Sequence, residues 1–168
     1  MHDEAMRWVA EHVTGRQFGT VVELGSRDVN GNPRHLFGDA TYIGVDIAPG
    51  DGADVVCDAA DYLPDVPVDC VVSTEMLEHS PRARDTVLQV FKMLQPGGMF
   101  VMTAAGPGRA PHSAIDGKGL QDGEHYANIE PAELAAWLEE AGFVDCVIDV
   151  QPRPADIRCV AFRPGAMG

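Results

Sequence analysis

The sequence lacks three features that mark common classes of protein: a cluster of basic residues, a long apolar run and paired cysteine motifs. Its 12 Lys and Arg residues stand against 26 Asp and Glu residues, which gives a formal net charge of −14. A chain this acidic has no patch that would neutralise a phosphate backbone, and an anionic lipid surface would repel it. No apolar run approaches the roughly 20 residues of a membrane-spanning helix. We therefore expect neither a nucleic-acid partner nor a membrane.

The four cysteines are Cys57, Cys70, Cys146 and Cys159, and no two of them form a Cys-x-x-Cys pair. Each falls in a predicted strand or at a strand end, which favours buried free thiols over disulfides or a zinc site. Residues 1–16 mix charged with apolar residues, so we expect no secretory signal. These features predict a cytoplasmic protein, either a monomer or a homodimer.

Enough apolar material is present for one ordinary core. Of the 168 residues, 45% are hydrophobic and 7% are aromatic, which excludes a disordered acidic tail. A chain of this length has room for little more than one core. We therefore predict a single domain over residues 1–168.

Short β-branched runs alternate with segments of helical periodicity along the chain. Strands are expected at 20–24, 41–45, 53–57, 68–73, 99–103, 144–150 and 157–163. Helices are expected at 6–13, 34–37, from an N-cap at Ser80 with Pro81 in the first turn to about 94, and from 131 to 141. The first helix is expected to pack at a sheet edge, and Pro96-Gly97-Gly98 to form a turn.

This alternation predicts an α/β fold with a mostly parallel sheet covered by helices on both faces. Ligands bind such sheets beyond the carboxyl ends of the strands, where several acids of this chain lie. Residues 104–128 show no periodicity, and a stretch of that length in a compact domain is typical of an active-site lid. We expect the N-terminal helix and this lid to form much of an acceptor pocket.

The first two predicted strands end in a glycine and an acid whose separation in sequence is typical of a ribose-binding site. Asp46 follows Gly25 by about 20 residues, the spacing at which an acid on the neighbouring strand grips two ribose hydroxyls. The glycine would let a ligand approach the backbone of the first loop. The alternative interpretation is a tight turn at Gly25 and a solvated strand end at Asp46.

Five motifs follow one another in order: Val-Val-Glu-Leu-Gly, Tyr-Ile-Gly-Val-Asp, Cys-Asp-Ala, Glu-Met-Leu-Glu-His and Leu-Gln-Pro-Gly-Gly-Met-Phe. In this order, over about residues 20–163, the chain resembles class I S-adenosylmethionine-dependent methyltransferases. The resemblance implies a Rossmann-like, doubly wound three-layer sandwich with a seven-stranded sheet and one antiparallel strand. It also implies S-adenosylmethionine as the cofactor.

The same resemblance implies the residues that contact this cofactor. Glu23 and Gly25 would face its methionine moiety, Asp46 its ribose, and Asp58 with Ala59 its adenine. Glu75 and its neighbours would close the cavity near the sulfonium. The full set of expected cofactor-binding residues is Glu23, Gly25, Ser26, Arg27, Asp46, Ile47, Asp58, Ala59, Thr74 and Glu75.

The first loop departs from the family pattern. Arg27 and Val29 stand where further glycines are common, and glycine returns only at Gly31. The departure predicts a wider loop, in which Arg27 or Asn30 contacts the cofactor carboxylate. It weakens a nicotinamide dinucleotide as the alternative ligand, because a pyrophosphate needs a glycine-lined helix start.

Methyl transfer from a sulfonium is an in-line displacement on an activated donor, so the protein aligns the acceptor and excludes water. A hydroxyl or protonated amine must also lose a proton, and His79 and His112 are the candidate catalytic bases. His125 and Tyr126 are candidates for lining the acceptor pocket. Glu75, Glu78, His79 and the histidines of the lid carry oxygen and nitrogen ligand atoms, but their spacing matches no metal-ligand pattern, so we expect no metal.

Two hypotheses about function remain open at this point. The first is a methyltransferase that acts on a small molecule or on a glycan or lipid precursor. The second is a non-catalytic accessory or interaction module that binds S-adenosylmethionine or a nucleoside, which the altered glycine loop permits.

Overall fold

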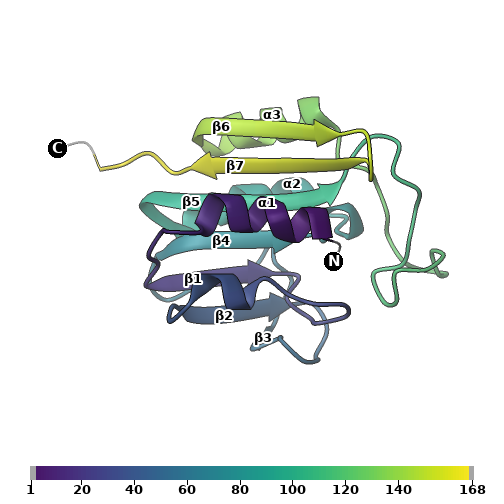
Figure 1. The fold of residues 1–168 in the computed structure, drawn as a ribbon, viewed down its shortest axis with the longest axis horizontal. Helices are drawn as coiled ribbons and strands as arrows, with labels where there is room; N and C mark the ends of the chain where they lie inside the picture. The colour runs from purple at the N-terminus through teal and green to yellow at the C-terminus, as the bar shows by residue number, and fades with distance from the viewer. Residues whose placement is uncertain (1–2, 167–168) are drawn as a thin grey trace.

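The structure is a computed structural model that describes residues 3–166, and one seven-stranded sheet runs through it (Figure 1). The strands are β1 Thr20–Leu24, β2 Thr41–Asp46, β3 Val55–Val56, β4 Val68–Thr74, β5 Leu94–Ala105, β6 Val144–Gln151 and β7 Asp156–Phe162. Their order is β3-β2-β1-β4-β5-β7-β6, and β7 runs antiparallel to both of its neighbours. The predicted α/β fold class with one antiparallel strand is confirmed.

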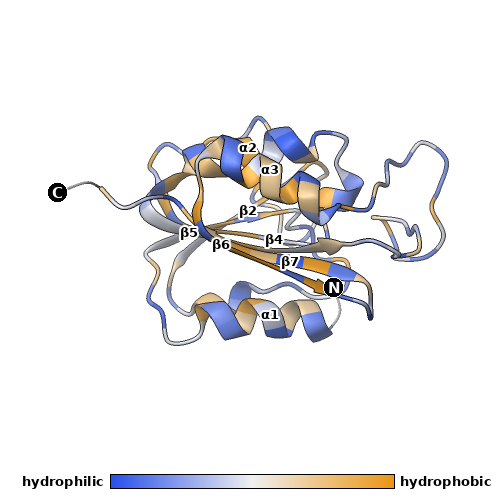
Figure 2. Ribbon diagram, turned by 90° about the horizontal axis from the view of Figure 1, so that it is seen from above, coloured by the Kyte–Doolittle hydropathy of each residue, from blue (hydrophilic) through white to orange (hydrophobic). Residues whose placement is uncertain are grey.

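Helices cover both faces of this sheet, as Figure 2 shows. The helices are α1 Asp3–Val13, the 3-10 helices η1 Arg34–Phe37 and η2 Leu77–His79, α2 Ala83–Met93 and α3 Pro131–Ala141. α1 lies on one face, and α2 and α3 lie together on the other. Two buried clusters result, one on each side of the sheet. The three-layer arrangement follows from strands that are apolar on both faces.

α1 packs against the middle of the sheet, so the expectation that it would sit at a sheet edge is wrong. Its residues Trp8, Val9 and Val13 are buried in one cluster with Val101 of β5 and Val160 of β7. These strands are central enough to offer a continuous apolar surface to the helix, which an edge strand would not.

The sequence placed most elements correctly, and three differences have local causes. Strand β3 is shorter than expected. The Asp54 carboxylate accepts a hydrogen bond of 2.7 Å from the Gly44 N–H, in place of a backbone hydrogen bond between the strands. Helix α2 begins at Ala83, because the Ser80 hydroxyl accepts the Arg82 N–H at 3.1 Å in a turn that precedes the helix. The Pro-Gly-Gly segment lies inside β5, where its pairing with β4 is irregular and Gly97 has a φ of 81°.

All four cysteines are free thiols, and two of them are fully buried, Cys70 and Cys159. Cys57 is half-buried and Cys146 is exposed, so the prediction of buried thiols is wrong for Cys146. Its strand, β6, forms the outer edge of the sheet. In the part of the chain described, no helix combines the length and apolar composition needed to cross a membrane.

Candidate active site

A cavity of about 490 Å³ opens at the carboxyl ends of β1, β2 and β4, beneath the long segment 106–130. The residues predicted to bind the cofactor and the two candidate bases all line it: Glu23, Gly25, Ser26, Arg27, Asp46, Ile47, Asp58, Ala59, Thr74, Glu75, His79 and His112. Figure 1 shows the segment 106–130 extending away from the sheet at that end. The sheet topology therefore brings together residues that lie far apart in the sequence.

The cavity wall also contains residues that the sequence did not single out. They come from the loops after β1, β2 and β4 and from the lid: Asn32, Ala48, Met76, Ser80, Pro81, Ser113, Ala114, Ile115, Gly117 and Glu124 among them. No residue of α1 contributes, so the expectation that the N-terminal helix forms the acceptor pocket is wrong. His125 and Tyr126 are likewise absent from the lining, although the Tyr126 ring lies next to two residues that do line it.

Glu23, near the end of β1, is a buried carboxyl group. The Tyr42 hydroxyl of β2 donates a hydrogen bond of 3.0 Å to its Oε2. Burial is the main cause that raises the pKa of Glu23 to about 8, and the hydrogen bond from Tyr42 opposes the rise. The carboxyl group of Glu23 is therefore largely protonated at neutral pH, and a cation beside it would favour its ionised form.

The backbone of the turn after β1 lies very close to the side chain of Met76. Gly25 has a φ of 78°, and a Cβ on it would lie 2.5 Å from Cγ of Met76, so a larger residue would not fit. The neighbouring Ser26 hydroxyl is buried and has no hydrogen-bond partner among the described residues. A buried hydroxyl in this position is a donor or acceptor left for a ligand.

Asp46 closes β2, and backbone amides orient its carboxylate. Oδ2 accepts the Arg27 N–H at 3.0 Å, and Oδ1 accepts the Ala48 N–H at 2.9 Å. Each carboxylate oxygen can accept a second hydrogen bond, so the group stays able to bind two vicinal hydroxyls. Ile47 follows and is 74% exposed as a residue, which places an apolar surface in the wall of the cavity.

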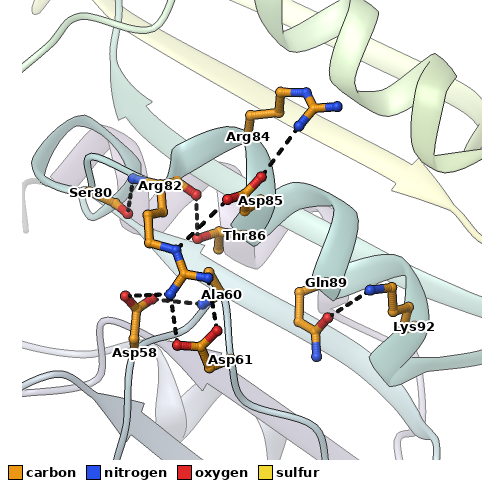
Figure 3. A network of polar contacts seen from close by, with 10 residues as sticks. All are labelled: Asp58, Ala60, Asp61, Ser80, Arg82, Arg84, Asp85, Thr86, Gln89 and Lys92. Carbon is orange, nitrogen blue, oxygen red and sulfur yellow. Dashed lines mark hydrogen bonds and ion pairs between the residues drawn. The ribbon is translucent and has the colours of Figure 1, made fainter.

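Asp58 is held in place by Arg82, as Figure 3 shows. Nη1 of Arg82 lies 3.0 Å from Oδ2 of Asp58, and the same guanidinium forms two hydrogen bonds with Asp61, at 2.7 and 2.8 Å. Asp58 also accepts the Ala60 N–H at 2.9 Å. The network ties the loop after β3 to the start of α2. Arg82 could not be found from sequence, since its partners lie more than one element away.

Glu75 follows β4 in a conformation that is rare for a residue with a side chain. Its φ is 53°, and its N–H donates to the Thr103 carbonyl at 2.9 Å. The Thr103 hydroxyl donates to Oε1 of Glu75 at 2.9 Å, and Arg109 lies 3.5 Å from Oε2. Backbone strain of this kind clusters at functional sites, where surrounding bonds hold it.

His79 and His112 come from different elements and meet at the cavity. Their ring centroids are 5.0 Å apart, and the Tyr126 ring contacts both. Burial, and then the proximity of His112, lowers the pKa of His79, which keeps its imidazole neutral at physiological pH. Beneath them lies Glu78, fully buried, whose pKa is raised well above its usual value chiefly by that burial.

A family model described as a methyltransferase domain matches residues 1–146 of the sequence. The chain belongs to this methyltransferase domain family. The match confirms the resemblance that the five ordered motifs predicted.

Two curated relatives share part of this methyltransferase domain. A probable S-adenosylmethionine-dependent methyltransferase of Mycolicibacterium smegmatis is 35% identical over 104 residues, 62% of this chain and 37% of that protein. A ubiquinone biosynthesis O-methyltransferase of Xanthomonas axonopodis is 38% identical over 82 residues, 44% of this chain and 34% of that protein. The chain thus covers about a third of the length of each of these relatives.

Solved structures share its fold. The 1,6-didemethyltoxoflavin N1-methyltransferase of Burkholderia thailandensis, solved with 1,6-didemethyltoxoflavin and S-adenosylhomocysteine, superposes with a TM-score of 0.66 at 18% identity. The superposition covers 96% of this chain and 80% of that one. It confirms the Rossmann-like fold of the methyltransferase domain.

Proposed function

We propose that this methyltransferase domain transfers the methyl group of S-adenosylmethionine to a small-molecule acceptor or a glycan or lipid precursor. One observation carries the proposal: the carboxyl groups of Glu23, Asp46 and Asp58, from the ends of three neighbouring strands, line a single cavity. The cofactor carries two cationic centres and a ribose, which this wall of acids suits. A nicotinamide dinucleotide would bring a pyrophosphate instead, and the first loop lacks the glycines to cradle it.

The chemistry of each wall supports an assignment of the cofactor. Glu23 and the buried Ser26 hydroxyl would receive the amino-acid end, and Arg27 its carboxylate. Asp46 keeps acceptor capacity for the two ribose hydroxyls. Ile47 offers an exposed apolar side chain to one face of the adenine. Asp58, which Arg82 holds in place, would accept a hydrogen bond from the amino group of the adenine.

When bound, S-adenosylmethionine supplies an electrophilic methyl group on a positively charged sulfur. The chain's own residues then align the acceptor and keep water out, since no nucleophilic side chain is needed. Glu75, Met76 and the lid residues 112–115 bound the volume next to that methyl group. An imidazole there takes the proton from a hydroxyl or amine acceptor. His79 suits this task, because its lowered pKa leaves it neutral, and His112 is the second candidate.

The cavity volume supports a small acceptor. About 490 Å³ lies within the range of small-molecule sites and must hold both the cofactor and the acceptor. Three of the lid residues that face it are small, Ser113, Ala114 and Gly117, and they leave room for the acceptor. The lid acid in the cavity wall, Glu124, accepts hydrogen bonds from the Ser113 hydroxyl and from the N–H groups of Ala114 and Gln121.

The test is calorimetric binding of S-adenosylmethionine to the wild-type chain and to Asp46→Ala. We expect micromolar affinity for the wild type and at least roughly a tenfold loss for the variant, because a ribose diol loses its carboxylate partner. Asp39→Ala, which changes an acid outside the cavity lining, is the matched control and should bind as the wild type does. Absence of wild-type binding would contradict the proposal.

An acceptor screen separates transfer from binding alone. Formation of S-adenosylhomocysteine above the solvent background, with a panel of phenols, amines and sugar or lipid precursors, supports an enzyme. Binding without any such product would favour the non-catalytic module, for which the altered glycine loop at Arg27 and Val29 is the specific observation.

A further inference from the structure

Three side chains with ligand atoms converge on one point beside the cavity. Glu78 and His79 belong to η2, and His112 comes from the lid. One carboxylate oxygen and one nitrogen of each imidazole all lie within 4.8 Å of one another. Glu78 is fully buried, and neither of its oxygens has a hydrogen-bond partner among the described residues. Buried groups in this state are rare and call for an explanation.

A contact with a backbone carbonyl indicates which nitrogen of His112 carries the hydrogen. Its Nδ1 lies 3.2 Å from the carbonyl oxygen of Ala110. A carbonyl can only accept, so Nδ1 carries the hydrogen and the neutral ring presents a lone pair at Nε2. Nε2 lies 4.0 Å from Oε1 of Glu78. A buried carboxylate oxygen that faces a nitrogen lone pair is stabilised by a proton or a cation between them.

His79 favours a cation over a shared proton. Its Nδ1 is buried and makes no hydrogen bond within residues 3–166. One proton can satisfy two facing acceptors, whereas a metal ion can take a third ligand. The imidazoles are also supported from behind, as metal-bound histidines are: His112 donates its other N–H to a backbone carbonyl. The Ala127 N–H donates to the Glu78 carbonyl at 2.8 Å, which fixes the lid against η2.

We propose that Glu78, His79 and His112 bind a divalent transition-metal cation such as Zn²⁺, with an open coordination position toward the cavity. Two imidazoles and one carboxylate are a ligand set of catalytic zinc sites, which keep their fourth position for water or substrate. Both histidines line the cavity, so that position faces the acceptor volume. Zinc–ligand distances of about 2 Å require the three ligand atoms to close by roughly 1 Å. The proposal places this closure at His112, the ligand that comes from the lid.

The role of the ion rests on the proposed function, whereas its binding does not. An acceptor hydroxyl that ligates the ion has a lowered pKa and releases its proton to water. The resulting oxygen attacks the methyl carbon, the new O–C bond forms with the oxygen's electron pair, and the C–S pair returns to sulfur as the sulfonium becomes a neutral thioether. When the ion is bound, His79 and His112 are its ligands, and the acceptor's proton goes to water and not to either imidazole.

The sequence did not predict this site, and we expected no metal there. Glu78 and His79 are adjacent, which matches no ligand spacing, and the third ligand comes from the lid. Only the contact between η2 and the lid brings them together.

The test is calorimetric titration of the chelator-treated full chain with ZnCl₂. We expect about one ion per chain with micromolar or tighter affinity in the wild type, and a loss of roughly tenfold or more in Glu78→Gln and in His112→Ala. His125→Ala, which removes an exposed histidine from the same lid, is the matched control and should bind as the wild type does. Co²⁺ in place of Zn²⁺ should give the visible absorption of a low-coordinate site, and Glu78→Gln should abolish it.

Equal zinc affinity in the wild type, Glu78→Gln and His112→Ala would overturn the proposal, and so would an equal loss in His125→Ala. Glu78→Gln keeps the size of the side chain and removes a buried acid, so it answers the question even if His112→Ala folds poorly. Binding of S-adenosylmethionine is measured on the same samples. If the chain binds the cofactor and no zinc, the proposed cation site is overturned and the proposed function stands. If the chain does not bind the cofactor, the proposed function is overturned.

Discussion

Single residues at the strand ends show what sequence reasoning can reach. The side chains of Glu23, Asp46 and Asp58 were placed at one site because parallel strands end at one edge of a sheet, and the cavity contains all three. What spacing could not show is the state of each group. The pKa of Glu23 depends on its burial and on Tyr42, which lies on another strand.

Glu23 makes the stability of the chain depend on pH. Its carboxyl group has an ordinary pKa near 4.5 when unfolded, and burial raises the pKa to about 8 in the folded chain. Between these values the folded state holds a proton that the unfolded state has lost, so the stability from the protonated group is full below about pH 4.5 and is lost as the pH rises through about 8. The free energy of unfolding should fall by up to about 1.4 kcal/mol per pH unit in that window.

Urea unfolding of the wild type and of Glu23→Gln between pH 5 and 9 measures this dependence. Glutamine keeps an acceptor for the Tyr42 hydroxyl and cannot ionise, so its stability should lack the Glu23 contribution to the slope. The variant should gain stability relative to the wild type as the pH rises. Parallel curves for the two chains would show that Glu23 titrates normally in the folded state.

At the scale of elements, strands and long helices were predictable, and their connections were not. β-Branched runs and the glycine that follows α3 are local signals, and they predicted the bounds of β1 and α3 and placed the end of β4 one residue early. Helix η2 has only three residues and no periodicity to detect. The lid has no regular structure over residues 106–130, so its path depends on contacts with distant strands.

Arg109 supplies the main polar contact between the lid and the sheet. Its guanidinium pairs with the fully buried Asp156 of β7, lies 3.5 Å from Glu75 and donates to the Pro154 carbonyl at 3.2 Å. Arg109→Met would leave the Asp156 carboxylate with the weaker contact to Arg158, at 3.5 Å. We expect a loss of roughly 3 kcal/mol in unfolding free energy, since a buried charge loses the shorter of its two ion pairs with arginine.

Denaturant unfolding and limited proteolysis measure the two consequences of Arg109→Met. The variant should unfold at lower denaturant and be cut faster within residues 107–127 than the wild type. The double variant Arg109→Met/Asp156→Asn should recover part of the stability, because it removes the buried charge that had lost its ion pair with Arg109, but should keep the faster cleavage. Unchanged stability and cleavage in the single variant would mean that other contacts hold the lid.

At the scale of the whole molecule, the net charge of −14 has two meanings. It disfavours polyanionic partners, and part of it lines the cavity. Sequence order predicted the sheet and the family, since both follow from the succession of strands and motifs. The place of α1 on the sheet face and the meeting of Glu78 with His112 depend on long-range packing, which no spacing within the sequence encodes.

A crystal structure of the chain with S-adenosylhomocysteine shows whether the strand-end cavity binds S-adenosylmethionine through its acids. We expect the ribose hydroxyls within hydrogen-bond distance of the Asp46 carboxylate, the adenine beside Ile47, Asp58 and Ala59, and the amino-acid end near Glu23. A ligand bound elsewhere, or an adenine at the Glu23 end of the cavity, would contradict this expectation.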